Sequence, residues 1–426
     1  MAFDTDKSLR NQVMYSVFVR NYSEEGTFEG VRKDLQRIKD LGVDIIWLMP
    51  IHPLGEKARK GVLGSPYAIK NYREINPEFG TIDDFRRLVE DIHALGMKCI
   101  IDVVYNHTSP DSWLSQNHPE WFYHKADGSF GNRVGDWTDI IDLDYSNRDL
   151  WDYQIDTLKM WAEIVDGFRC DVAPLVPLEF WQKARAEVAK VRENCIWLAE
   201  SIEHGFIRYI RSQGMTALSD SEIYEAFDIA YDYDVAGEFV DCLLGKISLA
   251  EYAKALNLQE TIYPDNYVKL RFLENHDRPR AHQLISSEKA LRIWTAFMYF
   301  QKGMPLVYNG QEVGEVHLPS LFDKDTVDWK VKTDLTPLMQ KLYSIRKDSL
   351  FADSDYSVTS PCEGVLLASH TLKDSKITGV FPVKSADALV NVSMADGTYT
   401  DLLTGKSVEV KFGMLGVTDE AVIIKA

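Results

Sequence analysis

Four short segments of this chain begin as apolar runs and end in carboxylates with other polar residues beside them. They read IIDVVYNH at 100–107, GFRCDVA at 167–173, WLAES at 197–201 and FLENHD at 272–277. A carboxylate at the end of a buried strand costs free energy unless it faces a polar cleft or a partner. Four such strand ends, spread through the chain, predict one site built from loops at the same end of a barrel.

The segments between these runs have the spacing of amphipathic helices. Apolar residues keep helical spacing over 31–41, Gly42 follows as an expected C-terminal cap, and the apolar run VDIIWLMP comes next. The same order returns at 81–96, where Thr81 is the expected N-cap, and KCIIDVV follows. Near-continuous apolar strands that alternate with amphipathic helices predict a parallel sheet.

Counting these strands gives the fold class, an α/β chain with a (β/α)8 TIM barrel. The doubly wound alternative is weaker, because no glycine-rich phosphate loop follows the first strand. The expected strands cover residues 13–20, 44–50, 98–105, 167–172, 195–199, 225–230, 268–273 and 305–308.

Two changes in composition and residue pattern along the chain predict how it is divided into domains. Residues 106–148 are rich in Trp, Tyr, His, Asp and Gly and have little periodicity, which indicates a small insertion after the third strand. From about residue 350, short apolar runs alternate with turn signals, which predicts a small antiparallel β domain. The expected parts are the first part of the barrel at 1–105, the insertion at 106–148, the second part of the barrel at 149–349 and a C-terminal β-sandwich at 350–426.

Charge and composition exclude several classes of partner. The net charge of −18 argues against binding to nucleic acid or to an anionic membrane surface, because both need a basic patch. No run approaches the ~20 apolar residues of a membrane span. The five cysteines are an odd number, and we expect them to be reduced. With no secretory signal at the start, a cytoplasmic protein is expected, or a secreted one whose signal has been removed.

The carboxylates suit glycoside hydrolysis with retention, which needs two carboxyl groups about 5–5.5 Å apart. Asp171 suits the attack, because Arg169 lies two residues before it, points to the same side of the strand and would keep it ionised. Glu200 suits the acid/base role, because the apolar residues before it would raise its pKa. Asp277, next to His276, could hold sugar hydroxyls.

In the order in which they occur, the four segments resemble the four conserved regions of the α-amylase superfamily of retaining glycoside hydrolases, glycoside hydrolase family 13. LGVDIIWLMP, NPEFGT and GMPLVYNGQE match supporting segments of the same family, and the resemblance spans about residues 10–345. It implies Asp171 as nucleophile, Glu200 as acid/base and Asp277 as transition-state stabiliser. It also implies a sugar site before the cleaved bond, formed by Tyr67, His107, Arg169 and His276 and supported by Asp102.

The resemblance also raises the question of calcium. Family members often hold Ca²⁺ between the third-strand loop and the insertion, and Asn106 and Asp142 match two of those positions. Oxygen ligands are what this cation requires. The alternative is that Asn106 only caps a loop. No organic cofactor is expected.

The implied function is a retaining α-glucan hydrolase acting on malto-oligosaccharides or starch fragments through a covalent glycosyl-enzyme. Many α-amylases have Lys-His shortly after the nucleophile, where this chain has Pro174 and Leu175. Val172 looks more like neopullulanases and 1,6-acting glucosidases, so α-1,6 cleavage or transglycosylation is the alternative. A carbohydrate-binding relative without catalysis is least expected, since all three carboxylates are present.

One position and the oligomeric state stay open at this point. A tryptophan often follows the acid/base segment, and this chain has Glu203 and His204 there instead. They either shape the leaving-group side or are simply solvated. The chain does not show the extra N-terminal domain with which many neopullulanase-type enzymes dimerise, so a monomer is expected.

Overall fold

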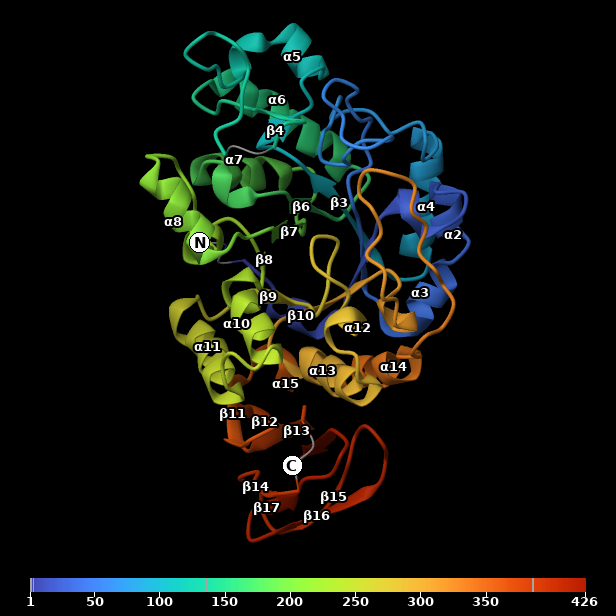
Figure 1. The fold of residues 1–426 in the computed structure, drawn as a ribbon, viewed down its shortest axis with the longest axis vertical. Coiled ribbons are helices and arrows are strands. Elements are labelled where there is room, and N and C mark those ends of the chain that lie inside the picture. Colours follow the sequence, from blue (N-terminus) through green and yellow to red (C-terminus); the bar gives the residue numbers. More distant parts are fainter. Residues whose placement is uncertain (1, 3, 135–136, 385–386) are drawn as a thin grey trace.

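The computed structural model describes residues 2, 4–134, 137–384 and 387–426. A barrel with its outer helices lies in the middle of the molecule, the insertion lies at the top of the view, and the C-terminal sheets lie at the bottom, beside α11 Leu249–Ile262, α13 Glu288–Phe300 and α15 Leu350–Asp353 (Figure 1). Within the described residues, no helix is both long and apolar enough to span a membrane.

The barrel is closed and its strands are parallel, as the sequence predicted. Around it the strands follow the order β1-β10-β9-β8-β7-β6-β3-β2. Nearly every strand residue is buried, because the barrel interior covers one face of the sheet and the outer helices cover the other. The strands are β1 Met14–Val17, β2 Ile45–Leu48, β3 Lys98–Val103, β6 Gly167–Cys170, β7 Ile196–Ala199, β8 Ile229–Tyr231, β9 Val268–Arg271 and β10 Met304–Tyr308.

The expected strand bounds differ from the observed ones, most of all for two strands. The sixth was expected at 225–230, but β8 covers Ile229–Tyr231, because residues 223–228 close hydrogen-bonded turns after a short helix, α9 Asp220–Ile223. The first was expected to run to residue 20, but β1 ends at Val17 and α1, Val19–Tyr22, follows. Phe18 and Val19 are fully buried, so an apolar run alone could not show where the strand ended.

The helices around the barrel follow the expected periodicity, with one interruption. The spacing over 31–41 belongs to two short helices, α2 Phe28–Arg32 and α3 Leu35–Gly42. Thr81 caps α4, Ile82–Ala94, through a capping box with Asp84. The other long helices are α6 Arg148–Ala162, α7 Leu178–Val188, α8 His204–Ser212, α10 Tyr233–Leu243, α11 Leu249–Ile262, α13 Glu288–Phe300 and α14 Thr336–Arg346.

The insertion leaves the barrel after β3 and returns at α6. Its two short strands, β4 His107–Thr108 and β5 Ile141–Asp142, pair antiparallel, and α5 Trp113–Asn117 lies between them in sequence. Its aromatic residues largely pack on one another: the ring of Trp121 stacks on His118 at 3.8 Å between centroids. The rings of Trp113 and Trp121 also contact Tyr153 of α6, which ties the insertion to the barrel.

After α15, Leu350–Asp353, the chain forms two four-stranded antiparallel sheets with a small apolar core of their own between them. The first sheet has the order β11-β12-β13-β18 and the second β14-β17-β16-β15. The strands are β11 Asp355–Cys362, β12 Val365–Leu372, β13 Ser375–Pro382, β14 Leu389–Asn391, β15 Gly397–Thr400, β16 Ser407–Lys411, β17 Met414–Gly416 and β18 Val422–Lys425.

Candidate active site

The polar ends of four barrel strands meet at one face, as the sequence predicted. Asp102 of β3 lies opposite Arg169 of β6 in the parallel register, and Asp171 follows β6 directly. Glu200 follows β7, the neighbour of β6, and Asp277 lies in the loop after β9. The carboxyl ends of parallel strands lie at the same face of a barrel, which is why residues so far apart in sequence come together.

Arg169 is the centre of the site. Its Nη1 donates to Asp102 Oδ1 at 2.9 Å and to Asp171 Oδ1 at 2.9 Å. Its Nη2 lies 2.9 Å from Glu200 Oε1, as an ion pair whose N–H is not aligned for a hydrogen bond. Asp171 and Glu200 therefore converge on one guanidinium.

The sequence analysis placed Arg169 among the residues around the sugar and Asp102 as their support. In the structure neither side chain has any exposed surface. They lie beneath the carboxylates, and Arg169 orients Asp171 and Glu200 from below. The rings of Trp47 and Tyr231, which the sequence analysis did not identify, enclose this guanidinium at 5.1 and 5.4 Å.

The acidities of the carboxyl groups differ. Burial raises the pKa of Glu200 to about 7, and the nearby charges of Asp171 and Asp277 add to the rise against the effect of Arg169. The direction agrees with the expectation for an acid/base group. Burial also raises the pKa of Asp171, and this effect outweighs the opposing effect of Arg169.

Glu200 is also held by strained backbone. Its Oε2 accepts a hydrogen bond from the backbone N–H of Val172 at 2.8 Å. Val172 has φ +35° and ψ +43°, a left-handed conformation that a β-branched residue rarely adopts. This strained residue follows Asp171 directly, and its conformation points its backbone N–H at the carboxylate of Glu200.

Asp277 faces the open cleft, and its side chain is 41% exposed. Burial raises its pKa, but His276, Arg169 and Arg278 outweigh that effect and hold the pKa below its ordinary value. His276 Nε2 lies 2.9 Å from Asp277 Oδ2 and 2.7 Å from the hydroxyl of Tyr67. The rings of Tyr67 and His276 are stacked, which gives this side of the cleft an aromatic wall.

His107 completes the other side of the cleft. Its Nε2 lies 3.9 Å from Asp171 Oδ2, and burial lowers its pKa to about 4, so the ring is neutral at neutral pH. Asn106 Nδ2 lies 3.1 Å from His107 Nδ1. If that amide donates, the ring carries its proton on Nε2, toward Asp171 and the cleft.

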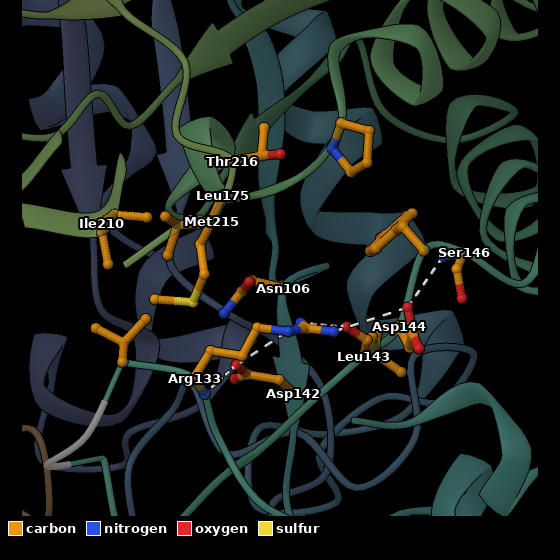
Figure 2. Close-up of a pocket in the computed structure, with 14 residues that line it drawn as sticks. Asn106, Arg133, Asp142, Leu143, Asp144, Ser146, Leu175, Ile210, Met215 and Thr216 are labelled. Atoms are coloured by element: carbon orange, nitrogen blue, oxygen red, sulfur yellow. Dashed lines mark hydrogen bonds and ion pairs between the residues drawn. The ribbon is translucent and has the colours of Figure 1, made fainter. Parts of the chain in front are cut away.

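Asn106 and Asp142, the expected calcium ligands, line one hollow of about 360 Å³ between the insertion and α8 (Figure 2). Asp142 Oδ2 accepts from the backbone N–H of Arg133 at 2.7 Å, whereas Asp142 Oδ1 is buried without a hydrogen-bond partner. The described residues contain no group of three or more His, Cys, Asp or Glu side chains that could hold a metal. The donors present are oxygens and fit a hard cation that completes its shell with carbonyls and water.

Two family profiles match the chain. The one described as the catalytic domain of alpha amylase matches residues 6–127 and 110–349. The one described as the bacterial alpha amylase C-terminal domain matches residues 357–424. Between them they cover most of the barrel, the insertion and the C-terminal sheets.

Solved structures and a curated relative agree. An α-amylase from Lactobacillus plantarum is 52% identical, with 99% of this chain and 100% of that chain covered and a TM-score of 0.97. A noncanonic maltogenic α-amylase from Thermotoga neapolitana is 34% identical, with coverages of 98% and 99% and a TM-score of 0.87. Alpha-amylase 2 of Dictyoglomus thermophilum is 23% identical over 92% of this chain and 72% of that protein. The chain belongs to the α-amylase family of glycoside hydrolases.

Proposed function

We propose that the protein is a retaining α-glucan hydrolase that cleaves malto-oligosaccharides or starch fragments through a covalent glycosyl-enzyme. The observation that carries the proposal is the convergence of Asp171 and Glu200 on the guanidinium of Arg169. Each of the two carboxyl groups has an oxygen 2.9 Å from a nitrogen of this guanidinium. We expect retention, because inversion needs a wider gap between the two acids, with room for a water molecule.

In the proposed reaction Asp171 attacks the anomeric carbon while Glu200, whose pKa is raised to about 7, gives its proton to the leaving oxygen. Glu200 then takes a proton from the water that cleaves the ester to Asp171. Asp277, held ionised by its neighbours, stabilises positive charge on the sugar ring. Tyr67, His107 and His276 would bind the sugar before the cleaved bond.

The test is Asp171→Asn. We expect turnover of maltotriose to fall by on the order of 10⁴-fold or more, because a nucleophile cannot be replaced by its neighbours. The melting temperature should stay close to that of the unchanged enzyme. Freshly released sugar from the unchanged enzyme should be the α-anomer by NMR. Retained turnover in the variant, or a β-anomer as first product, would refute the mechanism.

Cleavage of α-1,6 links or transfer to a sugar is the second candidate. Pro174 and Leu175 stand in place of the Lys-His of many α-amylases, and Val172 looks more like neopullulanases and 1,6-acting glucosidases. A relative named probable oligo-1,6-glucosidase 3, from Bacillus subtilis, is 25% identical over 75% of this chain. The products formed from maltotriose, panose and pullulan separate the two candidates. Only an enzyme that cleaves α-1,6 bonds splits the α-1,6-linked sugars of panose and pullulan from each other.

We also propose a structural Ca²⁺ held by Asn106 and Asp142. It would tie the insertion to the barrel and take no part in bond cleavage. Removal with EDTA should lower the melting temperature by a few degrees, because a ligand at 100 times its Kd stabilises the folded state by about 2.7 kcal/mol. Asp142→Asn should abolish that calcium-dependent shift, whereas an equal shift in this variant would exclude the site.

We further propose that the enzyme acts as a monomer in the reducing cytoplasm. All five cysteines are described by the structure and none is paired, and four of them are buried. The groups of the site come from one chain, so assembly is not needed to complete it. Light scattering at micromolar concentration tests the first part, and fractionation of the source cells tests the second.

A further inference from the structure

Two loops meet beside Glu200 and Asp277. Arg278, in the loop after β9, forms an ion pair with Glu203, in the loop between β7 and α8. The two side chains and the carboxyl groups of Glu200 and Asp277 line one open hollow of about 440 Å³. The position of Glu203 is the one that sequence analysis left open between a role at the leaving-group side and simple solvation.

The hollow lies on the leaving-group side of the proposed chemistry. It includes Glu200, which would protonate the leaving oxygen, but its lining does not include Asp171, His107 or Tyr67. Those three residues surround the place where the anomeric carbon of the donor sugar must lie. A sugar in the hollow would therefore be the one beyond the cleaved bond.

The charged pair is held in place and remains accessible. The guanidinium of Arg278 lies over the ring of Tyr233 at 4.8 Å, and the hydroxyl of Tyr233 accepts a hydrogen bond from Asn275 at 3.0 Å. The side chains of Glu203 and Arg278 are 51% and 33% exposed. Their free N–H groups and carboxylate oxygen can therefore reach a ligand without a rearrangement of either loop.

We propose that Glu203 and Arg278 form the acceptor-sugar site, where the carboxylate accepts from one hydroxyl group of a neutral pyranose and the guanidinium donates to its neighbour. This inference rests on the proposed hydrolase function. A vicinal diol presents a donor and an acceptor side by side, which matches a fixed carboxylate–guanidinium pair. The hollow would recognise a sugar mainly through charge-assisted hydrogen bonds, with Phe206 as its apolar side.

The same pair would influence transfer. In transfer, the acceptor's hydroxyl oxygen bonds to the anomeric carbon, the bond from that carbon to Asp171 breaks, and the hydroxyl proton passes to Glu200. A sugar held by Glu203 and Arg278 competes with water for this step. Weakening the pair should therefore favour water.

The experiment compares two donors in Glu203→Gln, Arg278→Gln and Arg278→Lys. Maltotriose must place a sugar in the hollow to be cleaved into maltose and glucose, whereas α-maltosyl fluoride loses only fluoride. We expect the ratio of kcat/KM for maltotriose to kcat/KM for the fluoride to fall about tenfold in the two Gln variants, as the loss of a hydrogen bond to a charged group implies. Arg278→Lys, which keeps the charge, should lose less.

The matched control is Asp152→Asn, which removes an exposed ion pair with Lys183 at 2.8 Å on the outside of the barrel. Its ratio should match that of the unchanged enzyme. With maltose added as acceptor, the Gln variants should also give less transfer product for each fluoride released. An unchanged ratio in both Gln variants, or an equal fall in Asp152→Asn, would overturn the inference. If the unchanged enzyme releases no fluoride with retention, the proposed function itself fails.

Discussion

At the scale of single residues, the chemistry of the site depends on the fact that several buried carboxylates share one cation. Arg169 contacts Asp102, Asp171 and Glu200 with one guanidinium. Neighbouring buried carboxylates cannot all ionise at the same pH, so one of them retains a proton to a higher pH than the others. Burial and like charges raise the pKa of Glu200 to about 7, while the pKa of Asp277 is held below its ordinary value. Of Glu200 and Asp277, this difference places the proton on Glu200, the acid/base position.

The pKa of Glu200 predicts the pH profile. The proposed acid must be protonated, so kcat/KM should fall as the pH rises through about 7. The proposed nucleophile must be ionised, and its raised pKa places the acidic limb above 3.8. Initial rates on maltotriose from pH 3 to 9 check both limbs. A flat profile between pH 6 and 8 would contradict the assignment of Glu200.

Stability should respond to the same proton. The pKa of Glu200 rises from 4.5 to about 7 on folding, so its stabilising effect is complete below pH 4.5 and is lost as the pH rises through 7. At 1.36 kcal/mol per pKa unit, Glu200→Gln should exceed the unchanged enzyme in unfolding free energy by up to about 3 kcal/mol at pH 8. Urea unfolding at pH 8 and pH 4 measures this, and an equal difference at both values would refute it.

The sequence predicted that the carboxylates and Arg169 would lie together, but it did not show the backbone and loop contacts that hold them. Asp171, Glu200 and Asp277 end recognisable apolar runs, and their convergence follows from the parallel barrel alone. The left-handed backbone of Val172 and the contact of Arg278 with Glu203 depend on how particular loops close. No spacing in the chain encodes them, because the paired residues belong to loops separated by whole strands and helices.

At the scale of elements, the presence of each barrel strand was easier to predict than its first and last residues. Every expected barrel strand is present, but several expected ranges run past the observed ends into buried loops. The hydrophobic run from Phe18 to Val19 continues beyond β1 because the insertion side of the barrel also buries its loops. The N-cap at Thr81 was predicted correctly, since its hydrogen bonds form within one turn and do not depend on tertiary packing. The C-cap expected at Gly42 lies one residue further on, at Val43.

That local cap gives a prediction for α4. Thr81→Ala removes the side-chain oxygen that accepts from the backbone N–H of Asp84, and should lower the free energy of unfolding by about 1 kcal/mol. Thr81→Ser keeps the oxygen and is the control. Because α4 lies on the outer ring, kcat/KM on maltotriose should stay the same in both. Equal stability of the Ala and Ser variants in urea unfolding would show that the cap contributes nothing.

At the scale of the whole molecule, the first C-terminal sheet shares a core with the barrel. Phe381 of β13 lies 5.3 Å from both Phe297 and Phe300 of α13, measured between ring centroids. His370 of β12 lies 2.8 Å from the carbonyl of Phe300, and burial lowers its pKa to about 3, so it is neutral when folded. The second sheet packs on the first through a separate small core that includes Val390.

This arrangement predicts that the barrel and the first C-terminal sheet unfold together. Phe381 is fully buried, so Phe381→Ala should lower the free energy of unfolding by about 3–5 kcal/mol, and activity should be lost at the lower temperature as well. Val390→Ala removes two methyl groups from the separate core and should cost about 2 kcal/mol or less, with the thermal loss of activity nearly unchanged. Calorimetry and residual activity after heating are measured on both variants. If Phe381→Ala leaves the temperature of activity loss unchanged, or if Val390→Ala lowers it equally, the shared core does not couple the two parts, and the sheets stabilise only themselves.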